Sequence, residues 1–183
     1  VVGNHDIETG HEVYDRMVRT MDVPFLAANA LRTDNGRPYF QEYVTLKRYG
    51  LNITIIGFTN PNIKGWLSPV LWEGMTFESL LPMAQEVVDR VSAKEKSDVV
   101  IVAIHAGTGE GDGSSLESQG LDLYKSLRGV DFVVCAHDHR PVTYQNDSIC
   151  LINAGSHCRN LGMGTITLKV EDGKVVSRSL KAE

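Results

Sequence analysis

Two short apolar runs constrain the fold of this chain more than any other feature of its sequence. Residues 98–105 read DVVIVAIH and residues 130–136 read VDFVVCA. A strand with one solvent-facing side alternates apolar and polar residues, whereas a strand covered on both faces is apolar at consecutive positions. We therefore expect both runs to be inner strands of a sheet that carries other elements on both of its faces.

Helical and strand-like patterns alternate along the preceding part of the chain. Apolar residues at helical spacing predict helices over residues 9–21 and 77–96, and a shorter helix over 116–129. Residues 41–58 predict a β-hairpin, and residues 23–29 predict a short buried strand. Such alternation is typical of an α/β fold.

The end of the chain has a different pattern, typical of antiparallel strands. The stretches SICLINAG, MGTITLKVEDG and KVVSRSLKA are strand-like, and Asp172-Gly173 predicts the turn of a hairpin. A length of 183 residues is within the range of one domain. The whole chain, residues 1–183, is therefore predicted to form a single α/β domain with an antiparallel C-terminal section.

Composition excludes several functional classes. The formal net charge is −5 and no basic run occurs, so we expect no nucleic-acid polymer as partner. The longest apolar runs are only a few residues, too short for a membrane span. Cys135, Cys150 and Cys158 show no CxxC spacing, so we expect two buried thiols and one near the surface rather than a disulfide or a thiolate metal site.

Three apolar runs end in residues that can bind metal or transfer protons. Val1-Val2 leads into Gly3-Asn4-His5-Asp6, the run at 98–104 leads into His105, and Ala136 leads into His137-Asp138-His139. Parallel strands of an open α/β sheet share one carboxyl edge, and ligands bind there. The residues expected to converge at this edge are Asn4, His5, His105, His137 and His139.

Histidines at three strand ends predict a shared metal site. A single histidine at a strand end is more often a surface residue, but four of the six histidines of this chain lie at such ends. Imidazole is a common ligand of divalent transition metals, and an Asn oxygen can complete the ligand set. His137 and His139 would face the same side if the chain stays extended. His11 is expected to be solvated on the first helix, while His157 could line the same crevice.

These residues also carry a resemblance to a known family. Gly3-Asn4-His5-Asp6 resembles the GNH[DE] motif of calcineurin-like metallophosphoesterases, and His105 resembles their isolated metal histidine. Residues 136–139 resemble their GHxH motif, with Ala in place of the first Gly. GNHDIETG is similar to the GNHEFDxG of the 5'-nucleotidase branch. Residues 37–66 resemble a segment of 2',3'-cyclic-nucleotide 2'-phosphodiesterases and 5'-nucleotidases.

The resemblance implies a fold and a place for this chain within it. The fold would be the metallophosphoesterase-type layered α/β/β/α sandwich, lacking its first strands and metal motifs. The family's DxH and GDxxD motifs do not occur in this sequence and would lie before Val1. The chain is therefore expected to be a partial catalytic domain. The same branch implies a nucleoside-binding C-terminal domain in the parent protein.

The resemblance further implies two divalent metal ions in the intact enzyme, drawn from Mn, Zn, Fe, Co or Mg. The residues that it assigns to metal binding are Asn4, His105, His137 and His139. His5 would bind no metal, but would stabilise transition-state charge or protonate the leaving oxygen. Glu8, where the branch usually has Asp, would orient His5 and stabilise its charge.

The function implied for the intact protein is hydrolysis of nucleotide phosphoesters, as a 5'-nucleotidase or a 2',3'-cyclic-nucleotide 2'-phosphodiesterase/3'-nucleotidase. A periplasmic or cell-surface location is implied by resemblance as well. The alternative is a non-catalytic metal-binding or interaction module, and this chain by itself is expected to be inactive.

Two further features of the sequence each have a structural and a functional interpretation. The Gly- and Ser-rich residues 106–115 predict a flexible surface loop rather than a substrate gate. Trp66 and Trp72 are expected to be buried under a loop rather than to stack on a base.

Overall fold

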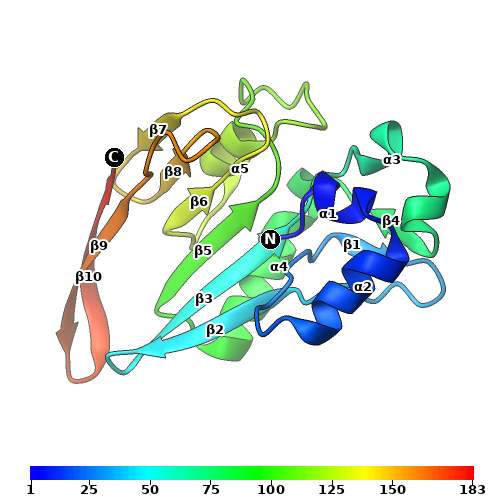
Figure 1. Cartoon of the computed structure of the whole chain (residues 1–183). Coiled ribbons are helices and arrows are strands. Elements are labelled where there is room, and N and C mark those ends of the chain that lie inside the picture. The colour runs from blue at the N-terminus through cyan, green and yellow to red at the C-terminus, as the bar shows by residue number, and fades with distance from the viewer.

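The computed structural model describes all 183 residues, which are arranged around a six-stranded mixed sheet (Figure 1). The strand order across this sheet is β2-β3-β5-β6-β8-β7. Its inner strands are mutually parallel, and both edge strands run antiparallel to their neighbours. The strands are β2 (Tyr43–Arg48), β3 (Leu51–Phe58), β5 (Val99–Ile104), β6 (Phe132–Val134), β7 (Val142–Gln145) and β8 (Cys150–Asn153). The expected α/β class and the inner positions of β5 and β6 are thus confirmed.

Two helices, α4 (Leu80–Glu95) and α5 (Gly120–Ser126), pack beside this sheet and share its main core. The apolar stripe of α4 is buried as the sequence predicts, because these side chains recur on one face at helical spacing. The buried residues of this stripe are Leu80, Ala84, Val87, Val88 and Val91. The helix ends at Lys96, which adopts a left-handed conformation with φ 52°.

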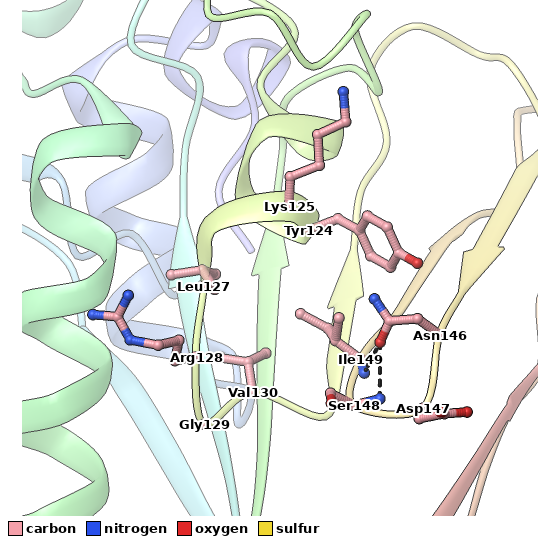
Figure 2. Close-up of a pocket in the computed structure, with 10 residues that line it drawn as sticks. All are labelled: Tyr124, Lys125, Leu127, Arg128, Gly129, Val130, Asn146, Asp147, Ser148 and Ile149. Carbon is pink, nitrogen blue, oxygen red and sulfur yellow. Dashed lines mark hydrogen bonds between the residues drawn. The ribbon is translucent and has the colours of Figure 1, made fainter.

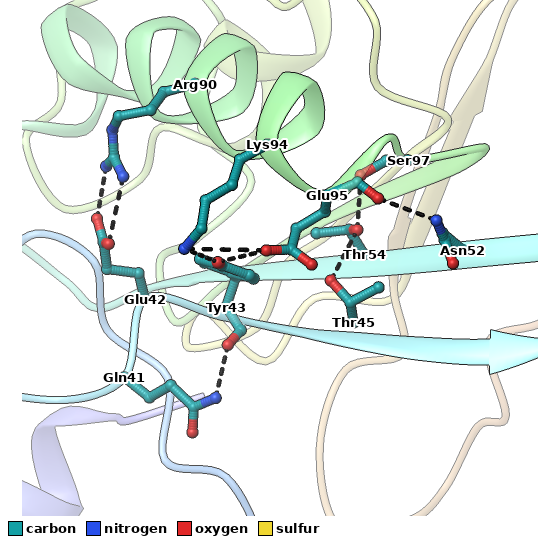
Figure 3. A network of polar contacts seen from close by, with 10 residues as sticks. All are labelled: Gln41, Glu42, Tyr43, Thr45, Asn52, Thr54, Arg90, Lys94, Glu95 and Ser97. Carbon is teal, nitrogen blue, oxygen red and sulfur yellow. Dashed lines mark hydrogen bonds and ion pairs between the residues drawn. The ribbon is translucent and has the colours of Figure 1, made fainter.

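A polar network ties the C-terminal half of α4 to β2 (Figure 3). Arg90 donates to both carboxylate oxygens of Glu42, with a shorter distance of 2.6 Å. Lys94 donates to the Tyr43 hydroxyl at 2.7 Å, and that hydroxyl donates to Glu95 at 2.7 Å. The predicted hairpin of residues 41–58 is present as β2 and β3. Helix α4 contacts it through these hydrogen bonds and ion pairs as well as through apolar packing.

Residues 1–40 and 63–77 form a second, smaller core. Its elements are α1 (Asn4–Glu8), α2 (His11–Thr20), β1 (Ala30–Arg32), α3 (Ile63–Trp66), η1 (Pro69–Trp72) and β4 (Met75–Phe77). The helix predicted over residues 9–21 begins at His11, because Gly10 with φ 80° separates α2 from α1. His11 is half-buried against Tyr14 and Tyr39, so the expectation that it is solvated is wrong.

Two predicted strands of the N-terminal region are absent as regular elements. Val1-Val2 is not a strand: the Val2 N–H donates to Leu26 O at 3.0 Å, and the chain then turns into α1. Residues 23–29 contain only one bridge, from Leu26 to Gln41, because the next amides donate to different segments. The Ala27 N–H bonds Gln41 O and the Ala28 N–H bonds Gly57 O.

The C-terminal hairpin of β9 (Gly164–Glu171) and β10 (Lys174–Ala182) is confirmed, with Asp172 and Gly173 at positive φ in its turn. In contrast, the predicted antiparallel strand at SICLINAG is parallel to β6 and antiparallel only to β7, a strand that the sequence did not predict. The hairpin lies at one side of the molecule in Figure 1.

The sheet face beside this hairpin is only partly covered. Val134 is 40% exposed, so the expectation that its strand is buried on both faces is wrong. An apolar groove runs between the sheet and β9, although Ile166 of β9 packs against Phe132 and Ile152 of the sheet. It is lined by Ile53, Val99, Ile101, Phe132, Val134, Ile152, Gly162, Gly164 and Ile166.

The burial of the cysteines follows expectation. Cys135 and Cys150 are buried, Cys158 is exposed, and all three are free. Burial raises the pKa of the Cys135 thiol to about 11. No helix of the structure combines the length and the apolar character that crossing a bilayer requires.

Candidate active site

Three of the predicted site residues meet at the carboxyl edge of the sheet. His105 follows β5 and His137 comes shortly after β6, its parallel neighbour, and their ring centroids are 5.2 Å apart. Asn4, at the start of α1, places its Oδ1 2.9 Å from Nε2 of His105. One amide oxygen and two imidazoles thus converge from three distant parts of the sequence.

Gly3 permits this approach of α1 to the sheet. A Cβ at position 3 would lie 3.0 Å from three ring atoms of His105, so any larger residue would displace the imidazole. The Gly3 N–H donates to Asp6 Oδ2 at 2.8 Å, which fixes the first turn of α1 and therefore the direction of Asn4. The glycine of the GNH[DE]-like motif is thus required by close packing.

His105 is held in its neutral form. Burial lowers the pKa of His105 to about 4, and the neighbouring His137 acts in the same direction. A neutral imidazole keeps a lone pair on one ring nitrogen, which is the form that binds metal.

His5 and Glu8 form an exposed pair on α1. His5 Nδ1 lies 2.7 Å from Glu8 Oε2, and the His5 side chain is 84% exposed. Residues three apart on a helix are neighbours, which explains the contact. The contact between these two side chains that the resemblance implies is therefore present, and the ring is open to solvent.

His139 makes no contact with the other three candidate ligands. His137 and His139 have φ values of 80° and 58°, so this segment is a tight turn, and the extended chain that would let both rings face the same side is not present. His139 packs beside His157, with ring centroids 6.0 Å apart. Neither a hydrogen bond nor a ring contact joins it to Asn4, His105 or His137. His157 itself is exposed on the neighbouring loop.

The turn is organised by Asp138, the residue between these two histidines. Its Oδ2 accepts the Thr108 N–H at 2.7 Å, and its Oδ1 accepts Asn153 Nδ2 at 2.7 Å. Asn153 Nδ2 also donates to the Thr108 hydroxyl, and both partners are buried. The carboxylate therefore connects the ends of β5, β6 and β8.

Two residues that sequence reasoning did not assign to the site contact His137. Glu117 Oε1 lies 2.9 Å from His137 Nε2, and Trp66 stacks on the ring with centroids 5.0 Å apart. Trp66 is 37% exposed, so the expected burial under a loop is wrong for it. Trp72 is half-buried and donates to Leu67 O. Glu117 lies in a polar loop with no pattern that marks it, so no sequence signal could have found it.

The donor set fits a divalent metal only in part. No three or more His, Cys, Asp and Glu side chains lie close enough to hold an ion by themselves. A metal here would depend on the amide oxygen of Asn4 besides His105 and His137, and on further ligands. Amide oxygen with imidazole suits Mn, Fe or Zn, which agrees with the chemistry expected from the motifs.

The pocket in Figure 2 lies elsewhere. Its walls are the segments that lead into β6 and β8, residues 127–130 and 146–149, together with Tyr124 and Lys125 of α5. These are the amino ends of parallel strands, whereas ligands of open α/β sheets bind at the carboxyl ends. We therefore assign the histidine edge, and not this pocket, as the candidate active site.

Comparison with known proteins finds a matching family model and several relatives. Residues 1–141 match the family model described as calcineurin-like phosphoesterase. The 5'-nucleotidase of Vibrio cholerae serotype O1 is 25% identical over 185 residues, which cover 97% of this chain and 34% of that protein. The trifunctional nucleotide phosphoesterase protein YfkN of Bacillus subtilis is 25% identical over 148 residues, 75% of this chain and 10% of that protein. The chain thus spans about a third or less of the length of these relatives.

A solved structure shows the same fold. The crystal structure of the calcineurin-like phosphoesterase YfkN from Bacillus subtilis superimposes with a TM-score of 0.79 over 99% of this chain and 61% of that chain, at 22% identity. The resemblance and the fold class expected from the motifs are both confirmed.

Proposed function

Since the chain belongs to the calcineurin-like phosphoesterase family, we propose that the intact protein hydrolyses nucleotide phosphoesters with divalent metal ions. The observation that carries this proposal is the convergence of Asn4, His105 and His137 at one sheet edge. Asn4 lies on the same short helix as the exposed His5–Glu8 pair. The nucleotide as substrate class is supported by the names of the curated relatives.

Each candidate residue receives a role in this proposal. Asn4, His105 and His137 would hold one metal ion, and His139 would serve a second. Divalent ions held there would supply the acidification of a water molecule and the neutralisation of charge on the phosphoryl oxygens. The metals are Mn, Zn, Fe, Co or Mg.

His5 and Glu8 act on the phosphoester itself. Glu8 accepts the Nδ1 proton of His5 and so leaves Nε2, on the exposed side of the ring, for the substrate. From there a protonated His5 stabilises negative charge on the phosphoryl group or delivers its proton to the departing oxygen. The exposure of the ring supports a role towards substrate rather than towards a buried ion.

The His5→Ala variant tests this assignment. We expect it to bind Mn²⁺ as the unchanged protein does and to lose turnover by about 10²–10⁴-fold, the usual contribution of a general acid. Equilibrium dialysis measures the metal, and phosphate release measures the turnover. Glu12→Gln, which changes an exposed carboxylate on α2, is the control and should retain both. Loss of metal from His5→Ala, or undiminished turnover, would contradict the role.

A substrate profile of the full-length protein with added Mn²⁺ tests the function as a whole. Nucleoside 5'-monophosphates, 3'-monophosphates and 2',3'-cyclic monophosphates distinguish the activities named above, and p-nitrophenyl phosphate reports general phosphoesterase activity. Failure to hydrolyse any of them while metal is bound would favour the non-catalytic module. The periplasmic or cell-surface location and the nucleoside-binding domain remain predictions, which fractionation of cells and sequencing of the parent gene check.

A further inference from the structure

The contact between Glu117 and His137 distinguishes the two nitrogens of the His137 ring. Glu117 Oε1 lies 2.9 Å from Nε2. An ionised carboxylate can only accept, so a neutral imidazole in this contact carries its proton on Nε2. The lone pair is then on Nδ1, and this nitrogen alone is available to a metal.

Glu117 is fixed in place although its loop is rich in glycine and serine. Its carbonyl oxygen accepts the Gly107 N–H at 3.1 Å and the Asn60 side-chain amide at 2.9 Å. Gly107 follows β5, while Asn60 follows β3 and is fully buried. The backbone at Glu117 is therefore tied to the carboxyl ends of two neighbouring strands, and its side chain starts from a defined point.

Trp66 fixes the plane of the same ring. Its indole, at the end of α3, stacks on His137 with an interplanar angle of 23°. His105 contacts the ring edge-to-face, at 68°. The His137 side chain is only 15% exposed between these groups. Rotation of the imidazole would break the stack and the bond to Glu117 together.

We propose that Glu117 and Trp66 are positioning residues that hold His137 as its Nε2–H tautomer and present Nδ1 to a divalent metal. This inference rests on the proposed function, because it assigns His137 to metal binding. A carboxylate on the second nitrogen of a ligating histidine fixes the ring and makes the coordinating nitrogen more basic. Removing such a partner costs about 10–100-fold in metal affinity.

The tautomer is measured first, on metal-free protein with ¹⁵N-labelled histidine. Long-range ¹H–¹⁵N correlations identify which ring nitrogen of His137 carries the proton. We expect Nε2–H in the unchanged protein and a mixture of tautomers in Glu117→Ala. An Nδ1–H tautomer in the unchanged protein would overturn the inference, whether or not the protein binds metal.

Metal affinity is measured second, by calorimetric titration with Mn²⁺. Glu117→Ala should weaken binding about 10–100-fold, and Glu117→Gln, which keeps an acceptor oxygen but loses the charge, should weaken it less. Trp66→Leu should weaken binding as well, and Trp66→Phe should restore part of the loss because it can still stack. Glu110→Ala, an exposed carboxylate of the same loop, is the matched control and should bind normally.

The two proposals fail in different ways. If the full-length protein binds no Mn²⁺ and cleaves no phosphoester, the proposed function is wrong. If it binds Mn²⁺ and both Glu117 variants bind equally tightly, with circular dichroism showing them folded, the positioning role is wrong and the proposed function stands.

Discussion

Asp138 shows how one side chain stabilises a strained backbone at the candidate site. The residues on both sides of it, His137 and His139, adopt left-handed conformations, which cost about 1–3 kcal/mol each for residues other than glycine. Two hydrogen bonds of 2.7 Å, from Thr108 and Asn153, hold the Asp138 carboxylate in place. The surrounding strands thereby offset the strain in the turn.

The Asp138→Ala variant tests this account. The buried Thr108 and Asn153 would lose a half-buried acceptor, so we expect the free energy of unfolding to fall by about 1–3 kcal/mol. Urea unfolding followed by circular dichroism measures it. Asp147→Ala, in an exposed turn, is the control and should change stability by less than about 0.5 kcal/mol. Unchanged stability of Asp138→Ala would mean that the turn is held by other contacts.

Among the helices and strands, those whose own side chains specify them could be predicted from sequence. The stripe on α4 and the continuous apolar run of β5 each define one element and its burial, and both are present as expected. Val1-Val2 looks equally strand-like, but its one strand-type hydrogen bond goes to Leu26, a partner that local sequence does not reveal.

Only some residues of the candidate site could be predicted from the sequence. Asn4, His105 and His137 could be predicted because strands of one parallel sheet end at one edge, and a motif marks each of them. The separation of His139 from them depends on positive φ values in a turn of non-glycine residues, which pattern does not indicate. Glu117 reaches His137 only through contacts of its backbone with Gly107 and Asn60, which are long-range in the sequence.

Gly57 marks a close approach between β3 and the irregular segment at residues 26–28. A Cβ built on Gly57 would lie 2.2 Å from Leu26 Cβ and 3.1 Å from the Leu26 carbonyl. The backbone carbonyl of Gly57 accepts the Ala28 N–H at 2.7 Å. The second core is thus joined to the sheet through a contact that has no room for a side chain.

Gly57→Ala is therefore expected to destabilise the protein by about 3 kcal/mol, at the upper end of the usual cost of overpacking. Thermal unfolding followed by circular dichroism measures the loss. Lys47→Ala, an exposed residue on the neighbouring strand, should leave the midpoint nearly unchanged. A Gly57→Ala protein as stable as the original would show that the segment around Leu26 moves away at little cost.

In the molecule as a whole, the β9–β10 hairpin is attached to the sheet by an apolar cluster and by one ion pair. Ile166, Leu180 and Ala182 of the hairpin pack against the buried residues Phe132, Cys150 and Ile152 of the sheet. Arg178 of β10 contacts the carboxylate of Asp131, which is 2% exposed, and donates to the carbonyl of Asp98. Asp131 also accepts the Val100 N–H at 2.8 Å, so the pair connects the hairpin to β5.

Arg178→Ala should weaken the attachment of the hairpin to the sheet. It leaves the buried Asp131 carboxylate without its cation, and we expect a loss of about 1–3 kcal/mol because Arg178 itself is partly exposed. Limited proteolysis should then cut within β9 or β10 before the remainder of the chain. Lys181→Ala, which removes an exposed pair with Glu183, should behave as the original. Equal resistance of both variants would contradict the importance of the Arg178 pair.

The hydrogen bond between Asn4 and His105 has a consequence for how the protein is made. It joins residues 101 positions apart, so it can form only after His105 has left the ribosome and β5 has paired with β3. Closing so long a loop costs entropy that the paired sheet must supply. A nascent chain therefore has no assembled candidate active site until this part of the domain has folded.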